Sequence, residues 1–309
     1  MQWRSWCAVA VMMVTSLTGF RAHAGVTPWL PFELDGGHIK IAVKVAGFDG
    51  YAILDTGAQG NAINSRFIRE HEIELDRGGK ITVLGVHSKK DSQVYNNVPL
   101  QLFGADTELD GVAEMRFASP DTAVLLGAPL LSQFIVQIDY PNSRMRLLTR
   151  DAVDLAKAEN IQFRRQLGYG QPIVEVTVNS DERIWLVLDT GNNGGLSIDR
   201  RAAERLGWLE LPKQSRQASD ISRTAEVELF SVPELKFGPY TLENVIATMP
   251  AEGETAYLES RGYRDGSAIR DKKVVGLLGY DVFKHFVLTL DYRGGHLHVG
   301  LPEEPAAAQ

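Results

Sequence analysis

The stretch ILDTG at residues 53–57 returns almost unchanged as VLDTG at residues 187–191. Each copy is an apolar, strand-like run that delivers one carboxylate, Asp55 or Asp189, into a Thr-Gly turn. A single Asp-Thr-Gly tripeptide is a weak signal, because Asp and Gly are common in ordinary turns. Two copies in matching contexts indicate an internal repeat that places one acidic side chain in each half of the chain.

The repeat extends well beyond this tripeptide. At the same offset of 134 positions, VP at residues 98–99 matches VP at residues 232–233. Further on, LLG at residues 125–127 recurs at residues 277–279, now 152 positions later. The second half therefore carries an insertion of about 18 residues, which we expect to form a surface loop at about 250–273, where the sequence is charged and contains glycine.

The first 24 residues have the pattern of a secretory signal peptide. A lone Arg4 precedes an apolar run at residues 6–14, and the small-residue sequence AHA ends at Ala24. This run is well short of the roughly 20 residues that cross a bilayer. We expect cleavage near Ala24, no membrane span in the mature chain and a periplasmic or secreted protein; an uncleaved membrane anchor is the alternative. The one cysteine, Cys7, lies inside the run, which leaves no thiol after cleavage.

The composition and the absence of other motifs exclude several function classes. The chain has 32 Lys and Arg residues against 39 Asp and Glu residues, so nucleic acid is not expected as a partner. No sequence motif of serine hydrolases, zinc peptidases or nucleotide-binding loops occurs. His296 and His298 share one face of a predicted strand, but no third ligand is signalled, so we assign them to a solvated face. We expect neither a metal nor a cofactor.

Both halves are predicted to consist mainly of strands. Residues 38–45 and 173–178 alternate between apolar and polar side chains, and turn residues follow them at short intervals. A short helix is expected after each Asp-Thr-Gly, with Ser65 as its N-cap in the first copy and Asp199 in the second.

The repeat also predicts how the chain is divided. The expected segments are a signal peptide at 1–24, an N-terminal lobe at 25–150, a solvated helical linker at 151–160, a C-terminal lobe at 161–302 and a tail at 303–309.

These features resemble the aspartic proteases of the retropepsin and pepsin type. Each half has an apolar-apolar-Asp-Thr-Gly loop followed by an apolar-apolar-Gly segment, and GLLGYDVF at residues 276–283 is similar to the end of the pepsins. The resemblance covers both halves. It implies an all-β, bilobal fold with a pseudo-twofold axis, closed barrels of the pepsin and retropepsin kind and short helices, in which one chain acts as a monomeric pseudo-dimer.

Two carboxylates on such an axis have a direct chemical use. If Asp55 and Asp189 approach each other, both cannot ionise cheaply, and they share one proton, as is known for the aspartic protease dyad. One ionised oxygen then acts as general base on a bound water, while the protonated partner donates to the scissile carbonyl. The predicted activity is that of an aspartic endopeptidase on a protein or peptide substrate, without a covalent intermediate.

The resemblance also implies roles around the dyad. The threonines are expected to bond across the axis to the backbone of the opposite loop, and the glycines to allow close backbone approach. The loop residues are Thr56, Gly57 and Ala58 in the first copy and Thr190, Gly191 and Asn192 in the second, and those packed beside the dyad are Leu126, Gly127, Leu278 and Gly279.

A hairpin at residues 81–94 is expected to close over the substrate as a flap. Val86, His87 and Ser88 lie near its predicted tip, and a counterpart is expected near residues 215–224. Such a lid would exclude water and clamp an extended peptide.

The second loop departs from the family pattern. The family usually has Ala, Ser or Thr after the Asp-Thr-Gly, as at Ala58, whereas the second copy continues with NNGG at residues 192–195. The amide of Asn192 is able to bond a carboxylate oxygen of Asp189, so the sequence leaves the effect of this loop on that aspartate open.

Other interpretations remain compatible with the sequence. A catalytically weak or inactive peptide-binding or adaptor protein on the same fold would bind peptides without turnover. Paired carboxylates also occur in glycoside hydrolases, which need them roughly 5 to 9.5 Å apart. Asp139 and Asp291 repeat as well, and we assign them to turns after core strands.

Overall fold

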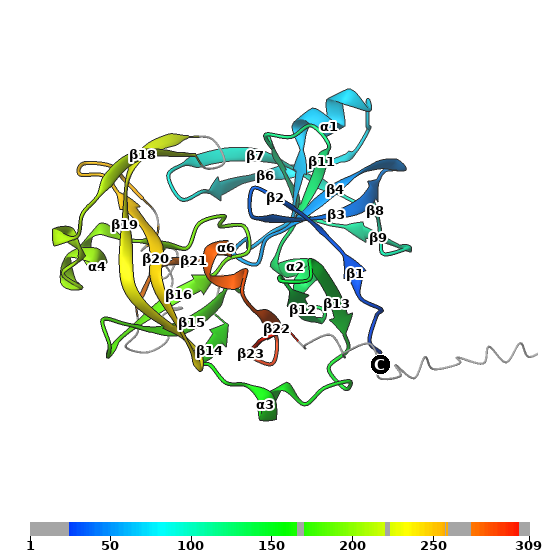
Figure 1. Ribbon diagram of the computed structural model, residues 1–309. Helices are drawn as coiled ribbons and strands as arrows, with labels where there is room; N and C mark the ends of the chain where they lie inside the picture. Colours follow the sequence, from blue (N-terminus) through cyan, green and yellow to red (C-terminus); the bar gives the residue numbers. More distant parts are fainter. Residues whose placement is uncertain (1–24, 166–169, 220–222, 257, 259–272, 303–309) are drawn as a thin grey trace, which may run out of the picture.

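The computed structural model describes residues 25–165, 170–219, 223–256, 258 and 273–302. The predicted signal peptide at 1–24, most of the predicted inserted loop and the tail at 303–309 lie outside these residues. The described chain forms three β-sheets with a few short helices (Figure 1), so the all-β class predicted from the sequence is confirmed.

The first sheet belongs to the N-terminal half. Its elements in chain order are β2 (Glu33–Asp35), β3 (His38–Val45), β4 (Phe48–Leu54), β5 (Ala62–Asn64), α1 (Ser65–Glu70), β6 (Asp76–Leu84), β7 (Lys89–Asn96), β8 (Val98–Leu102), β9 (Ala105–Leu109), β10 (Val112–Met115) and β11 (Thr122–Leu126). The strands pair in the order β6-β7-β10-β5-β11-β4-β3-β8-β9, with β2 added on β3.

The second sheet belongs to the C-terminal half. Its elements are β14 (Phe163–Arg165), β15 (Pro172–Val178), β16 (Glu182–Leu188), β17 (Leu196–Ile198), α4 (Arg200–Arg205), the 3-10 helix η1 (Trp208–Glu210), β18 (Gln214–Ser219), β19 (Thr224–Phe237), β20 (Tyr240–Pro250) and β21 (Val274–Leu278). The strand order is β14-β15-β16-β21-β17-β20-β19-β18, and an additional pairing of β15 with β19 closes the sheet into a barrel.

The two lobes follow one plan with a local difference. The long strands β19 and β20 run unbroken in the C-terminal lobe, whereas the N-terminal lobe divides the equivalent hairpin into β7, β8, β9 and β10. The breaks fall at Asn97 and next to Gly111, which have φ angles of 50° and 65°. In the C-terminal lobe, β20 contains Asn244 with a φ angle of 55° and still remains continuous, so Asn97 and Gly111 mark the breaks without being sufficient to cause them.

The third sheet joins the two halves. Its strands are β1 (Leu30–Pro31), β12 (Ile135–Asp139), β13 (Arg144–Leu148), β22 (Val287–Asp291) and β23 (His296–Gly300), and the short helices beside it are α2 (Ala128–Leu131), α3 (Leu155–Ala158) and α6 (Tyr280–Phe283). The order β1-β13-β12-β22-β23 places one strand of each half at the centre. There Gln137 lies opposite Thr289 and donates a 2.7 Å hydrogen bond to its hydroxyl. The pseudo-twofold axis therefore passes between β12 and β22.

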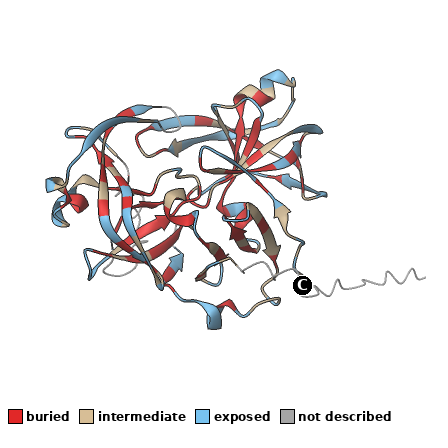
Figure 2. Cartoon of the chain, in the orientation of Figure 1, coloured by how far each residue is buried: buried red, intermediate tan, exposed pale blue. Residues whose placement is uncertain are grey.

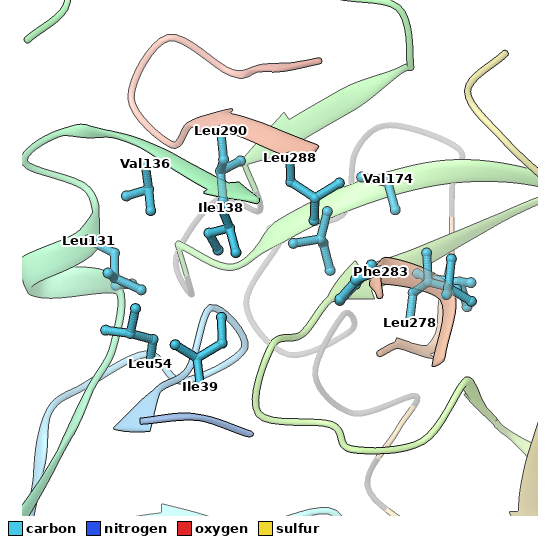
Figure 3. Packing of buried hydrophobic residues seen from close by; sticks show 14 of the residues in the cluster. Ile39, Leu54, Leu131, Val136, Ile138, Val174, Leu278, Phe283, Leu288 and Leu290 are labelled. Atoms are coloured by element: carbon cyan, nitrogen blue, oxygen red, sulfur yellow. The ribbon is translucent and has the colours of Figure 1, made fainter. Parts of the chain in front are cut away.

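One apolar cluster runs through both lobes and the shared sheet. Figure 2 shows that many residues of the strands are buried, and Figure 3 shows side chains of β12 and β22 gathered next to those of both lobes. Strand β21 is buried along its whole length because it lies between two other strands at the centre of its sheet. Among the described residues, no helix is long and apolar enough to cross a membrane.

The local expectations from sequence mostly agree with the structure, with one correction. Asp199 caps α4 as predicted, accepting from the backbone of Arg201. The cap of α1 is Asn64 rather than Ser65, which is already the first helical residue. The Asn64 amide has an oxygen that accepts from the backbone of Arg66 and a nitrogen that donates to the carbonyl of Thr122, so this fully buried side chain satisfies both strand and helix.

Asp139 and Asp291 have the structural roles predicted for them. Asp139 accepts from Arg144 Nε at 2.8 Å, and Asp291 accepts from Arg150 Nε at 3.1 Å and from the backbone of Arg293. Both carboxylates therefore serve the turns and ion pairs that follow the central strands.

The shared sheet yields a stability prediction. Leu288 is 1% exposed and faces Ile138 across the lobe boundary. Leu288→Ala is expected to cost about 2 to 5 kcal/mol, because it leaves a cavity at that boundary. Leu301→Ala is the control, since Leu301 is 58% exposed. Thermal unfolding compares the two; equal melting temperatures would mean that the lobes do not depend on this sheet.

Candidate active site

The two Asp-Thr-Gly loops begin where β4 and β16 end. In each lobe this strand lies parallel to the strand that carries the Leu-Leu-Gly segment, β11 or β21. The backbone N–H of Asp55 donates to the carbonyl of Leu126 at 3.0 Å, and that of Asp189 donates to the carbonyl of Leu278 at 2.9 Å. The same pairing therefore fixes the start of both acidic loops.

Gly127 and Gly279 allow the supporting segment to contact each loop. A Cβ atom at Gly127 would lie 2.4 Å from the carbonyl oxygen of Gly60, and one at Gly279 would lie 2.4 Å from that of Asn192. Neither contact is possible for a larger residue without moving the backbone, which explains why both Leu-Leu segments end in glycine. The neighbouring Leu126 and Leu278 are fully buried.

Thr56 and Thr190 connect the two loops. The hydroxyl of Thr56 donates to the carbonyl of Leu188 at 2.6 Å and accepts from the backbone N–H of Thr190 at 2.9 Å. In the other direction, the hydroxyl of Thr190 donates to the carbonyl of Leu54 at 2.7 Å and accepts from the N–H of Thr56 at 3.0 Å. These four buried hydrogen bonds are the cross-axis contacts that the family resemblance implies.

The glycines bring each loop against the carboxylate of the other. A Cβ atom at Gly57 would lie 2.4 Å from Cγ of Asp189, and one at Gly191 would lie 2.5 Å from Cγ of Asp55. The two aspartates, far apart in sequence, therefore face the same small volume between the loops.

The two carboxylates are held in different ways. Oδ1 of Asp55 accepts from the N–H of Ala58 at 2.9 Å, three residues further on. Oδ1 of Asp189 accepts from the N–H of Gly191 at 2.9 Å, two residues further on. Asp189 is buried, whereas Asp55 is partly exposed. The halves are thus equivalent in outline but not in hydrogen bonding.

The side chain of Asn192 does not bond the carboxylate of Asp189, although an amide at this position is capable of such a bond. Its Oδ1 accepts from the backbone N–H of Gly194 at 3.2 Å, and its Nδ2 is buried with no hydrogen-bond partner in the residues that the structure describes. An Asn side chain readily bonds the backbone two residues further on, and this bond competes with one to Asp189. The backbone carbonyl of Asn192 accepts from the N–H of Tyr280, so Asn192 stabilises the second acidic loop instead.

Two buried tyrosines lie close to the dyad and were not identified from the sequence. Tyr292 donates to the carbonyl of Thr56 at 2.8 Å, and burial together with the charges of Asp55 and Asp189 raises its pKa well above the usual value. Tyr140 occupies the matching place in the other half. Burial and the charge of Asp189 also raise its pKa, and within the described part of the chain its hydroxyl has no hydrogen-bond partner. The repeat of the Asp-Tyr dipeptide after each central strand was the available signal.

A cavity of about 700 Å³ is lined by both aspartates. Around them the lining is mostly apolar, with amide and hydroxyl side chains interspersed, and within the described residues its other titratable side chains are His38 and His87. The site therefore combines two carboxylates with walls that are largely apolar.

The predicted flap hairpin is present as β6 and β7. Its turn is closed by a hydrogen bond from Gly85 N–H to the carbonyl of Ser88 at 2.9 Å. Val86 and His87 line the cavity, and Val86 packs against an apolar cluster of the C-terminal lobe. Ser88 is buried and does not line the cavity. The tip thus reaches from one lobe to the other.

The matching hairpin of the C-terminal lobe is formed by β18 and β19. Residues 220–222 at its tip lie outside the described part of the chain, and Ala218 and Ser219 line the cavity.

The threonine contacts predict that removing one hydroxyl group lowers the stability of the protein. Thr56→Val keeps the shape but removes a hydroxyl that makes two buried hydrogen bonds, and it should destabilise the protein by about 1 to 3 kcal/mol. Thr56→Ser, which keeps the hydroxyl, should cost less. In thermal unfolding, Thr190→Val should add less in the Thr56→Val background than alone. Equal effects of Val and Ser at Thr56 would contradict the contact.

The tyrosines predict a loss of stability in alkali. Their raised pKa means that the folded chain holds these protons more tightly than the unfolded chain, in which tyrosine ionises near pH 10. Their contribution is therefore complete below about pH 10 and is lost as the pH rises further. The melting temperature should fall less steeply above pH 10 in Tyr292→Phe than in the unmodified protein. Identical slopes would rule out this contribution.

Comparison with known proteins agrees with this geometry. A family model described as aspartyl protease matches residues 174–282, which contain the second Asp-Thr-Gly loop and its Leu-Leu-Gly segment. None of the curated proteins compared with the chain matches it. The family model supports a protease function, and it supports the assignment of this chain to the aspartic protease family that its sequence resembles.

Proposed function

We propose that the protein is an aspartic endopeptidase that uses Asp55 and Asp189 as a dyad. The observation that carries the proposal is the reciprocal contact of the two loops. Each glycine lies against the carboxylate of the opposite loop, and the two threonines hydrogen bond across the same interface. Such an arrangement holds the two acidic groups together through contacts between the loops themselves.

The proposed reaction follows from two carboxylates in one small volume. They share one proton, because two negative charges in contact are costly, and they titrate as a pair. The ionised partner takes a proton from a water as that water attacks the scissile carbonyl, and the protonated partner donates to the carbonyl oxygen. The roles then exchange, and the leaving amine receives a proton. The peptide bond is hydrolysed with no covalent intermediate.

The cavity and the hairpin fit an extended peptide. Side chains of the substrate would enter the apolar parts of the cavity wall, and its backbone would pair with strand edges. The β6–β7 hairpin would act as the lid that excludes water. Val86 and His87 at its tip are the flap residues that touch the cavity.

The site of action is inferred from the sequence. The signal-like residues 1–24 support export, so we propose that the protein acts in the periplasm or outside the cell after cleavage near Ala24. It would act as a monomer, because both aspartates belong to one chain.

The first experiment is cleavage of a denatured protein library between pH 3 and pH 8. Asp55→Asn and Asp189→Asn should each abolish cleavage, since each removes one carboxylate with little change in shape. Asp49→Asn is the matched control, because Asp49 is exposed and pairs with Lys44 at the surface. It should cleave like the unmodified protein.

The outcomes separate the candidate functions. Loss of cleavage in both dyad variants, with normal folding, establishes the shared dyad. Peptide binding without cleavage by the unmodified chain would favour the adaptor function instead. Unchanged cleavage in either dyad variant would overturn the proposed mechanism.

A further inference from the structure

A second pair of residues occupies equivalent places in the two lobes. Lys40 pairs with Ile53 in the N-terminal lobe, and Ile173 pairs with Val187 in the C-terminal lobe; Ile53 and Val187 each lie two positions before the aspartate. Two positions before Lys40 is His38, and two positions before Ile173 is Gln171. Strand register therefore makes His38 and Gln171 equivalent.

Both side chains reach the acidic loop of the opposite lobe. Nε2 of Gln171 donates to the carbonyl of Gly57, and Nε2 of His38 lies 3.1 Å from the carbonyl of Gly191. Because a carbonyl oxygen only accepts hydrogen bonds, both nitrogens must carry a hydrogen toward it. Each Asp-Thr-Gly loop is thus held by a side chain from the other half.

The contact of Gln171 leads directly to a carboxylate. The carbonyl of Gly57 and the N–H of Ala58 belong to one planar peptide unit, so fixing one end fixes the other. That N–H donates to Oδ1 of Asp55 at 2.9 Å. Gln171 therefore acts on Asp55 through the 57–58 peptide.

Gln171 is unusually well buried for such a residue. It is 1% exposed, it lines the cavity, and its Oε1 has no hydrogen-bond partner among the described residues. The amide is therefore held by the single bond to Gly57, and a change that removes its N–H donor removes its whole polar contribution at this position.

We propose that Gln171 is a positioning residue for Asp55. His38 braces the Gly191 loop by a contact of the same kind, but the carboxylate of Asp189 is bonded there by the N–H of Gly191 and not by the peptide that His38 contacts. The inference rests on the proposed protease function for its kinetic consequence. Gln171 does not touch the reacting atoms; it keeps the peptide donor of Ala58 directed at the Asp55 carboxylate. Small displacements of a catalytic group lower the rate of the chemical step more than substrate binding.

Kinetics of Gln171 variants test the proposal. Gln171→Met keeps the length of the side chain without a donor, and it should lower kcat by about 10- to 100-fold with KM nearly unchanged. Gln171→His introduces the donor that the other lobe uses, and it should retain most of the activity. At the other loop, His38→Met should lose activity and His38→Gln should retain it.

The control is Gln133→Met. Gln133 also donates to a backbone carbonyl, that of Pro129, but Gln133 is exposed and this bond involves neither Asp-Thr-Gly loop. Its kcat and KM should stay those of the unmodified protein. Melting temperatures identify any variant that loses activity by unfolding.

Hydrogen exchange of the Ala58 amide gives a readout that needs no activity. Exchange of this N–H should be at least about 10-fold faster in Gln171→Met than in the unmodified protein and in Gln133→Met, because the 57–58 peptide is released. Unchanged exchange would overturn the positioning role even in a chain that cleaves nothing. Conversely, normal cleavage by Gln171→Met would refute the inference while leaving the endopeptidase function intact.

Discussion

The structure depends on the crossed hydrogen bonds of Thr56 and Thr190. Each hydroxyl both donates to a carbonyl and accepts from an N–H of the opposite lobe, so neither loop can shift without leaving buried polar groups unpaired. Both threonines are almost completely buried, where hydrogen bonds are stronger than in water. The separation of the two aspartates is therefore set by contacts that do not involve the carboxylates themselves.

The rest of the fold keeps these loops in register. Strands β12 and β22 pair across the lobe boundary, and the apolar cluster beneath them is continuous with both lobes. Strand β11 runs parallel to β4 and β21 runs parallel to β16, and each holds the start of the acidic loop in its lobe. Gly127 and Gly279 allow the supporting segments to approach these loops closely. The core positions the shared sheet, the shared sheet positions the two lobes, and the threonine contacts then hold the two acidic loops together.

Much of this arrangement was predictable because it repeats in the sequence. The acidic loops and the Leu-Leu-Gly segments follow from repeated short patterns, and the two-lobed all-β fold follows from the family resemblance that these patterns carry. The equivalence of Gln171 and His38 was not predictable, for two physical reasons. The two residue types differ, and the hairpin between β15 and β16 is one residue longer than that between β3 and β4, which changes the offset from the one that relates the aspartates.

Other local outcomes depended on competition between hydrogen-bond partners. The Asn192 side chain accepts from the backbone of Gly194, and Asn64 rather than Ser65 caps α1, because Asn side chains readily bond backbone groups nearby in sequence. Sequence spacing identifies which side chains are capable of such bonds. It does not determine which partner is closest after the lobes have packed.

Joining two halves in one chain also permits them to diverge. In a dimer of identical subunits, both aspartates would have the same surroundings. Here the Asp55 carboxylate accepts from Ala58 and that of Asp189 from Gly191, and Gln171 occupies the position that His38 has in the other lobe. Tyr292 donates to the Thr56 carbonyl, whereas the Tyr140 hydroxyl has no hydrogen-bond partner among the described residues. One chain therefore lets each acidic loop have contacts of its own, which two identical subunits related by exact symmetry do not allow.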